Sequence, residues 1–224
     1  MLHVSNLTKT IDSFTLSIDK LEIQHPLIYG LIGPNGCGKS TAAKLLCGIL
    51  QPDSGEIVTD IDKREITMVT QKPYIMDDTV YNNLGYPLRL RNIAAEPLCA
   101  EYLEKAGLSE RKNQRARGLS GGEKQKLALL RAMIFNPKII ILDEAMTDLD
   151  LDSLDLFENF FLERQRTNPI AVVIISHQLV QIRRLCDYVF FMSGGKLEAE
   201  GSTEELLRSP NPELRRYLKH EIPN

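Results

Sequence analysis

The run of residues 33–40, with the letters GPNGCGKS, constrains the fold of this chain more than any other feature. It fits the pattern G-x-x-x-x-G-K-[ST] at every fixed position. The continuous apolar run Leu27–Ile32 precedes it, as expected of a strand covered on both faces, and residues 40–50 follow it with helical spacing of apolar side chains. Glycines let such a loop fold its backbone N–H groups around phosphate oxygens. We therefore predict a P-loop NTPase core in which a strand, this loop and a helix bind a nucleoside triphosphate.

The predicted ATP-binding residues in and after the loop are Gly33, Pro34, Asn35, Gly36, Cys37, Gly38, Lys39, Ser40 and Thr41, and Ile11 completes the set. Lys39 can reach the β- and γ-phosphates, and the Ser40 hydroxyl can bind Mg²⁺. The helix that starts near Lys39 adds the positive end of its dipole. The chemistry needs no thiol at Cys37. That residue is either a small side chain that the loop tolerates or a modification-sensitive thiol whose alkylation would block ATP binding.

Composition and charge limit the classes of protein to which the chain can belong. With 224 residues, 43% of them hydrophobic and 25% charged, it can form one globular core with a smaller lobe. A net charge of −3 argues against a nucleic-acid partner. Four cysteines without a CxxC pair are typical of free thiols in a reducing compartment. Because neither a signal peptide nor a run of about 18 apolar residues is present, we expect a cytoplasmic protein to which other chains would supply any membrane part.

Alternating strand and helix patterns predict an α/β fold with a parallel sheet and flanking helices. The expected strands are Val4–Asn6, Phe14–Ile18, Leu27–Ile32, Ile66–Thr70, Ile139–Asp143, Val172–Ser176, Tyr188–Met192 and Lys196–Glu200. The expected helices are Ser40–Leu50, Glu96–Ala106, Glu123–Phe135, Asp152–Gln165 and one opened by the capping box Ser202–Glu205. The N-terminal strands predict a small antiparallel region, and Pro52–Gly55 predicts a turn.

The segment 72–136 differs in character from the residues on either side of it. Its β-branched runs vanish and helical patterns dominate. We predict that residues 1–71 and 137–224 form the α/β core, and that residues 72–136 form an inserted helical lobe. Because the chain ends soon after the last predicted helix, we expect no appended regulatory domain.

Two carboxylates follow the apolar strand Ile139–Leu142 directly. Asp143 can hold Mg²⁺ through water, and Glu144 can act as the general base on an attacking water. Taken alone, the pair would equally fit two ordinary charges at an exposed strand end.

A further motif decides between these alternatives. The run Leu119–Gln125, with the letters LSGGEKQ, opens the helix that ends just before the strand of Asp143. With it the sequence resembles the ATP-binding cassette (ABC) ATPase family over nearly its whole length. Gln71 fits the glutamine of the family's Q-loop, residues 147–150 (TDLD) fit its D-loop, and His177 fits its switch histidine. Together with the phosphate loop and the pair Asp143–Glu144, these elements occur in the order that the family shows.

The resemblance implies a site shared between two copies of the chain. In the family, a head-to-tail dimer sandwiches two ATP molecules between opposed loops. Ser120, Gly121 and Gly122 begin a second helix that can hold a phosphate, and they and Asp150 would serve the nucleotide of the other copy. Such an interface is isologous, so a homodimer closes it. A plain helix cap is the alternative for residues 120–122.

Two further roles follow from the resemblance. Gln71 would touch Mg²⁺ and the attacking water, so that Ser40, Gln71 and Asp143 are the expected metal ligands. His177 would contact the γ-phosphate and position the water that Glu144 activates. The alternatives are an amide in a strand-end turn for Gln71 and a surface or capping residue for His177.

The sequence departs from the family pattern at two places. Ile11 stands where many members carry an aromatic ring that stacks on adenine. Phe14 is near enough to substitute for that ring, but its alternation with neighbouring apolar residues fits a core residue equally well. Ala145 follows Glu144, where the family usually has proline, so the loop is expected to be less rigid there.

The function that the resemblance implies is that of the nucleotide-binding subunit of a membrane transporter. Segment 71–91 would bind transmembrane permease subunits on the inner face of the cell membrane, with Tyr74, Ile75, Met76 and Tyr81 as the docking surface. Packing of the helical lobe is the alternative role for these four residues. The same segment looks like that of bacterial solute importers for oxyanions such as tungstate or molybdate, or for small nutrients, which also use a solute-binding protein. A soluble ABC ATPase of an assembly process, and an exporter or lipid-extraction subunit, are the alternative functions.

Overall fold

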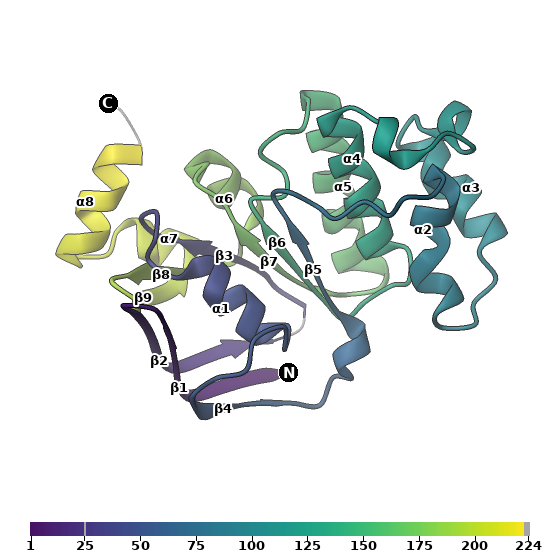
Figure 1. Ribbon diagram of the computed structural model, residues 1–224. Coiled ribbons are helices and arrows are strands. Elements are labelled where there is room, and N and C mark those ends of the chain that lie inside the picture. The colour runs from purple at the N-terminus through teal and green to yellow at the C-terminus, as the bar shows by residue number, and fades with distance from the viewer. Residues whose placement is uncertain (25, 222–224) are drawn as a thin grey trace.

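One sheet runs through the whole molecule. The computed structural model describes residues 1–24 and 26–221. Within them nine strands form a sheet in the order β4-β1-β2-β9-β8-β3-β7-β6-β5, drawn in Figure 1. None of the helices in this part of the chain is long and apolar enough to cross a membrane.

Five neighbouring strands of the sheet are parallel. They are β8 (Tyr188–Ser193), β3 (Ile28–Ile32), β7 (Ala171–Ile175), β6 (Ile139–Asp143) and β5 (Ile66–Thr70). Every residue of β3, β6 and β7 is buried, as the continuous apolar runs in the sequence predict. Because parallel strands end at the same edge, the loops that carry Gly33, Gln71, Glu144 and His177 lie along one side of the sheet.

The other four strands form the antiparallel part. They are β1 (Leu2–Ile11), β2 (Phe14–Ile23), β4 (Ser54–Thr59) and β9 (Lys196–Ser202). β1 pairs with β2 and β4, while β9 pairs with β8 and meets β2 at one residue pair only, Ser17 with Lys196. The antiparallel region is thus confirmed, although β1 and β2 are each ten residues long and extend beyond the short strands predicted.

Strand β4 was not predicted, and the turn predicted at Pro52–Gly55 runs into it. Its residues are exposed or half-buried, so no apolar pattern announces it. Gly55 has φ +79°, and a Cβ there would lie 2.2 Å from the Asn6 carbonyl oxygen. The glycine therefore lets β4 approach β1 closely at this point.

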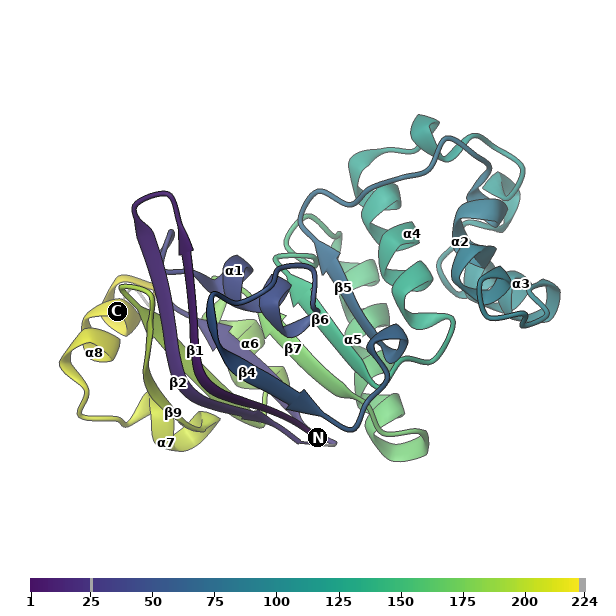
Figure 2. The same ribbon diagram turned by 60° about the horizontal axis from the view of Figure 1, so that its bottom comes forward.

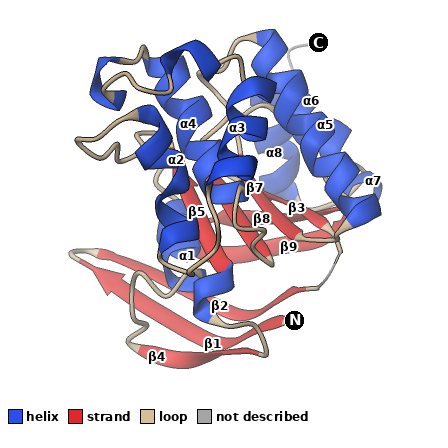
Figure 3. Cartoon of the chain, turned by 90° about the vertical axis from the view of Figure 1, so that its right-hand side faces the viewer, coloured by secondary structure: helices blue, strands red, loops and turns tan. Residues whose placement is uncertain are grey.

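Helices cover the sheet on both faces, as Figure 3 shows. They are α1 (Lys39–Leu46), α2 (Val80–Arg89), α3 (Glu96–Lys105), α4 (Gly121–Met133), α5 (Leu151–Thr167), α6 (Leu179–Leu185), α7 (Thr203–Leu207) and α8 (Pro212–Glu221), with 3₁₀ turns at Lys63–Glu65, Ser109–Arg111 and Ala116–Gly118. Alternate residues of strand β6 point to opposite faces of the sheet. Ile140 and Leu142 of β6 pack in the cluster that contains α4, α5 and α6, whereas Ile139 and Ile141 pack with α1 and strands β1 and β2.

Between β5 and β6 the chain is helical, and Figures 1 and 2 show α2 and α3 at the end of the molecule farthest from β1 and β2. Helix α2 was not predicted because Pro87 lies inside it. Leu84 of α2, Leu127 of α4 and Phe161 of α5 belong to one apolar cluster with β6. The division at residues 72 and 136 stays a prediction, since this cluster extends across it.

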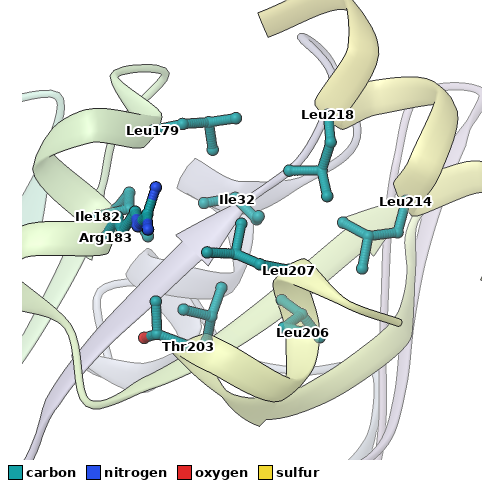
Figure 4. Close-up of a pocket in the computed structure, with 10 residues that line it drawn as sticks. Ile32, Leu179, Ile182, Arg183, Thr203, Leu206, Leu207, Leu214 and Leu218 are labelled. Carbon is teal, nitrogen blue, oxygen red and sulfur yellow. The ribbon is translucent and has the colours of Figure 1, made fainter. Parts of the chain in front are cut away.

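Helices α6, α7 and α8 pack together beside the end of β3. Figure 4 shows apolar side chains converging there, including Ile32 of β3, Ile182 of α6, Leu206 of α7 and Leu214 of α8. Neither α6 nor α8 was predicted from the sequence. The capping box at Ser202 and Glu205 is present and opens α7, as predicted.

Replacement of Phe161 by alanine tests the shared core. The ring is fully buried, so Phe161→Ala is expected to lower the free energy of unfolding by about 3–5 kcal/mol. Leu162, the next residue on the same helix, is 42% exposed, and Leu162→Ala should stay within about 0.5 kcal/mol of the parent. Urea denaturation of the two variants measures the difference, and equal losses would contradict the packing described here.

Candidate functional site

The loop at residues 33–40 joins the end of β3 to the start of α1 and requires glycine at two positions. Gly33 has φ +148°, and a Cβ there would lie 2.0 Å from the Met192 carbonyl oxygen. Gly38 has φ +105°, and a Cβ there would lie 2.7 Å from a Leu16 methyl carbon. Only glycine fits these two places, so the loop backbone is held in the conformation that the sequence pattern predicts.

Lys39 lies inside the loop and is buried. Its Nζ donates hydrogen bonds to the carbonyl oxygens of Gly33 at 2.7 Å and Pro34 at 2.9 Å. No carboxylate among the described residues lies within ion-pair distance of this ammonium group. The N-cap of α1 is Gly38, so no side chain covers the free N–H groups of the helix. A buried positive charge and a free helix N-terminus together favour an anion at this loop.

Ser40 and Asp143 meet at the edge of the sheet. The Ser40 hydroxyl donates to Asp143 Oδ1 at 3.1 Å. Burial raises the pKa of the Asp143 carboxyl, the Ser40 bond opposes this, and the charge of Glu144 adds to it. A cation beside the carboxylate would offset the cost of that buried charge.

The donors at this place fit Mg²⁺, which prefers oxygen ligands and keeps several waters or phosphate oxygens. Ser40 and Asp143 supply a hydroxyl and a carboxylate, and Thr70 pairs with Asp143 across the strands, so Gln71 follows at the same edge. Throughout the described chain no three His, Cys, Asp or Glu side chains are grouped closely enough to hold a metal ion by themselves. The site therefore fits an ion that is shared with a bound phosphate.

Glu144 and His177 form a direct pair at 2.7 Å between Glu144 Oε1 and His177 Nε2. Glu144 has φ +53°, an uncommon value for a residue other than glycine, and its backbone N–H donates to the Ile175 carbonyl oxygen at 3.0 Å. Both side chains are partly exposed at the carboxyl edge of β6 and β7. The structure thus brings together two of the three residues for which the sequence predicts catalytic roles, the third being Gln71.

Residues 120–122 lie apart from the phosphate loop of the same chain. Ser120 caps α4, accepting from the Glu123 backbone N–H and donating its hydroxyl to the Glu123 carboxylate at 2.8 Å. A Cβ at Gly121 would meet no atom within 4 Å. Figures 1 and 2 both show strands β5, β6 and β7 between α1 and α4. Within one chain, therefore, these residues and the loop do not form a common site.

Asp150 caps α5 in the structure. Its carboxylate accepts from the backbone and hydroxyl of Ser153 and lies 3.3 Å from Lys126 Nζ. The hydrogen bonds from Ser153 lower the pKa of Asp150 to about 2. The predicted contact of Asp150 with a second chain stays a prediction.

The hairpin of β1 and β2 carries the two candidates for contact with the base. Ile11 is exposed at its tip, paired with Phe14 across the turn. The Phe14 ring packs beneath the loop, 3.1 Å from where a Cβ of Gly38 would lie, and belongs to the partly buried residues of the core. Phe14 therefore has the core position that the sequence left open, and the role of Ile11 stays a prediction.

No role is predicted for Gln125 from the sequence, although it lies within the run 119–125. Its side chain is 3% exposed, and its Nε2 donates to the carbonyl oxygens of Ala145 at 2.7 Å and Thr70 at 3.3 Å. The available signal is an amide on the inward face of an otherwise apolar helix, which requires hydrogen-bond partners when it is buried.

Cys37 is buried, which bears on the two alternatives for it. The side chain is 4% exposed, and burial raises the pKa of the thiol, opposed by the nearby charge of Lys39. A thiol in such an environment stays protonated and unreactive at neutral pH. Burial therefore favours the first alternative, a small side chain that packs inside the loop, and the modification-sensitive thiol stays an untested prediction.

Comparisons with known proteins all find similarity to the same family. A family model described as "ABC transporter" matches residues 16–147. The chain is 35% identical to the tungstate uptake system ATP-binding protein TupC of Peptoclostridium acidaminophilum, covering 89% of this chain and 98% of that one. It is 31% identical to the methionine import ATP-binding protein MetN of Geobacillus kaustophilus (98% and 70% covered) and 33% identical to the phosphate import ATP-binding protein PstB of Saccharolobus solfataricus (87% and 84%).

Solved structures show the same fold. The ATP-binding subunit of an ABC transporter superposes with a TM-score of 0.87 at 20% identity, with 99% of each chain covered. A dimeric ATP-binding cassette in a post-hydrolysis state, bound to ADP and Pi, superposes with a TM-score of 0.80 at 23% identity, covering 91% of this chain and 99% of that one.

Thiol labelling tests the position of Cys37. Burial also raises the pKa of Cys99 to about 11 and that of Cys47 to about 12, so the folded protein is expected to react slowly with iodoacetamide at pH 7.5. Mass spectrometry should find Cys37 unmodified after the time in which the urea-unfolded chain is fully labelled. Rapid labelling of Cys37 in the folded protein, with loss of ATP binding, would contradict this result.

Proposed function

The chain belongs to the ABC transporter family of ATPases, and on that premise we propose that it is the ATP-hydrolysing subunit of a bacterial solute importer. Binding and hydrolysis of ATP are the activity of this family. The observation that carries the assignment of roles is the pair of Glu144 and His177 at 2.7 Å, beside Asp143 and the phosphate loop.

The loop, Lys39 and the N-terminus of α1 bind the triphosphate. Ser40, Gln71 and Asp143 would hold Mg²⁺, which neutralises charge on the phosphates. Binding of the anion gives Lys39 a partner stronger than the two carbonyl oxygens that it now contacts.

Glu144 acts as the general base. An ionised carboxylate accepts the hydrogen bond from His177, so the imidazole carries its proton on Nε2 and donates it to Oε1. The second carboxylate oxygen is then free to take a proton from the attacking water. His177 keeps the carboxylate oriented and lies beside the place of the γ-phosphate, because β7 ends next to β3 and β6.

A second copy of the chain completes the site. Residues 120–122 lie apart from the loop of their own chain, and Ser120 and Gly121 are exposed at the start of α4, so they suit a nucleotide that another copy holds. Asp150 would lie in the same interface. ATP binding closes this isologous dimer, and hydrolysis reopens it.

The transmembrane permease binds beside segment 71–91. Tyr74 is 74% exposed, and Tyr86 and Leu90 are also exposed along a recess of about 420 Å³ that Phe135 helps to line. Ile75, Met76 and Tyr81 are half-buried, and Ile75 and Tyr81 pack against the core. We therefore place the docking surface at Tyr74, Tyr86 and Leu90, a set that shares only Tyr74 with the four residues expected from the sequence. Aromatic and large apolar groups of this kind anchor protein interfaces.

The likeness to a tungstate uptake protein over almost its whole length supports an oxyanion as the cargo. In this proposal a solute-binding protein delivers the oxyanion to the permease. The chain itself works on the cytoplasmic face of the membrane.

Replacement of the base tests the mechanism. Glu144→Gln keeps the shape of the side chain but cannot accept a proton, so turnover is expected to fall about 100-fold or more while ATP still binds. Size-exclusion chromatography with ATP should then show an accumulated dimer. Glu104→Gln, an exposed change on α3, serves as the control. A near-parental rate for Glu144→Gln would overturn the assignment of the base.

Co-purification tests the membrane partner. The full chain, expressed with its neighbouring genes, should be recovered with an integral membrane protein from detergent-solubilised membranes. Tyr74→Asp places a charge in the docking surface and should reduce this recovery about tenfold or more, with unchanged ATPase activity of the isolated chain. Ile49→Asp alters a side chain that is 61% exposed elsewhere on the molecule and should have no effect. If the parent chain recovers no membrane protein, the importer proposal falls and a soluble assembly ATPase is favoured.

A further inference from the structure

Gln125 connects the helical segment to both catalytic loops. Its two hydrogen bonds reach the carbonyl oxygens of Ala145 and Thr70, at 2.7 and 3.3 Å. Ala145 follows Glu144 directly, and Thr70 precedes Gln71 directly. One buried amide on α4 therefore holds the backbone beside each of these two residues.

The backbone at Glu144 depends on such support. A residue other than glycine at φ +53° is in a sparsely populated conformation, which persists only where the surroundings fix it. On the sheet side the Glu144 N–H donates to Ile175 at 3.0 Å, and on the loop side the Thr147 N–H reaches the Glu144 carbonyl at a long 3.4 Å. The bond from Gln125 to Ala145 is the shorter restraint on the loop side, and it comes from α4.

Other contacts tie the first turns of α4 to the same loop. A Cβ on Gly122 would lie 3.7 Å from the Asp148 carbonyl oxygen, and Lys126 Nζ lies 3.3 Å from Asp150. The residues that open α4 thus form one contact unit with residues 145–150. These contacts would carry a displacement of the helix start to the backbone beside Glu144.

We propose that Gln125 is a positioning residue, which sets the places of Glu144 and Gln71 according to the position of α4. The inference rests on the roles proposed above for Glu144, Gln71 and residues 120–122. Because a partner's nucleotide would hold the start of α4, Gln125 makes hydrolysis in one site depend on the nucleotide in the other. Displacement of a catalytic group by about 1 Å costs about 100-fold in rate.

The chain offers a matched control for a merely structural glutamine. Gln181 on α6 is also buried, and among the described residues its Nε2 donates to Glu158 at 3.4 Å and not to Ala145 or Thr70. Gln125→Met and Gln181→Met remove the amide and keep an unbranched side chain of similar length. Gln125→Asn keeps the amide but is one methylene shorter and cannot span the same distances.

The first measurement separates turnover from binding in the full-length chain. Gln125→Met and Gln125→Asn are expected to lower kcat about 10- to 100-fold, with Kd for ADP within about twofold of the parent. Gln181→Met should keep the parental kcat. If Gln125→Met does not bind ADP, the Asn variant decides the question alone. An unchanged kcat, or a loss confined to nucleotide affinity, overturns the proposal.

The second measurement asks whether Gln125 acts through Glu144. In single turnover, Gln125→Met should slow Glu144→Gln by a clearly smaller factor than it slows the parent, because one of the two groups that Gln125 positions is already disabled. A full multiplication of the two losses overturns the inference and leaves the base assignment intact. Parental hydrolysis by Glu144→Gln alone would instead remove the proposed mechanism.

Discussion

Burial of β3, β6 and β7 on both faces is the constraint on which the rest of the structure depends. Strands that bury alternate side chains in two different apolar clusters cannot slip by one residue without placing each set in the wrong cluster. Their register is therefore fixed, and with it the height at which each strand ends. The phosphate loop, Asp143 and His177 lie together because three chemically unremarkable apolar runs stop at the same level.

Charge at that edge is arranged with little compensation inside the chain. Lys39 is buried against carbonyl oxygens, and Asp143 is buried beside a hydroxyl and next to a second carboxylate. Each of these charges costs free energy in the protein alone. A triphosphate with a divalent cation supplies opposite charge to both, so ligand binding also contributes stability to the folded state.

The parts of the fold that could be predicted are those that a short run of neighbouring residues specifies by itself. Strands β3, β6 and β7 lie within one residue of their predicted bounds because continuous apolar runs specify doubly covered strands. Strand β4 was not predicted because it is an edge strand without an apolar face. Helix α2 was not predicted because it contains Pro87, a residue that usually ends a helix. The fold of the ATPase core and the family were correctly predicted from motifs.

The candidate site divides in the same way. The loop, Asp143, Glu144 and His177 follow motifs that end strands, and the structure gathers them at one edge. Gln125 could not be assigned because its acceptors are backbone carbonyls that only the tertiary fold brings near. The burial of Cys37 likewise depends on packing that the sequence does not display.

The ring of Phe14 beneath Gly38 has a consequence for how such a sequence can evolve. The ring and the Leu16 methyl fill the space in which a side chain at position 38 would lie. A larger residue at position 14 or 16 would clash with the phosphate loop at Gly38, and a smaller one would leave a cavity beneath it. These two strand residues are distant from the motif in the sequence. Substitutions at them are nevertheless expected to be accepted in evolution only together with compatible changes in the loop, so the residues that evolve together with the nucleotide loop include more than its eight positions.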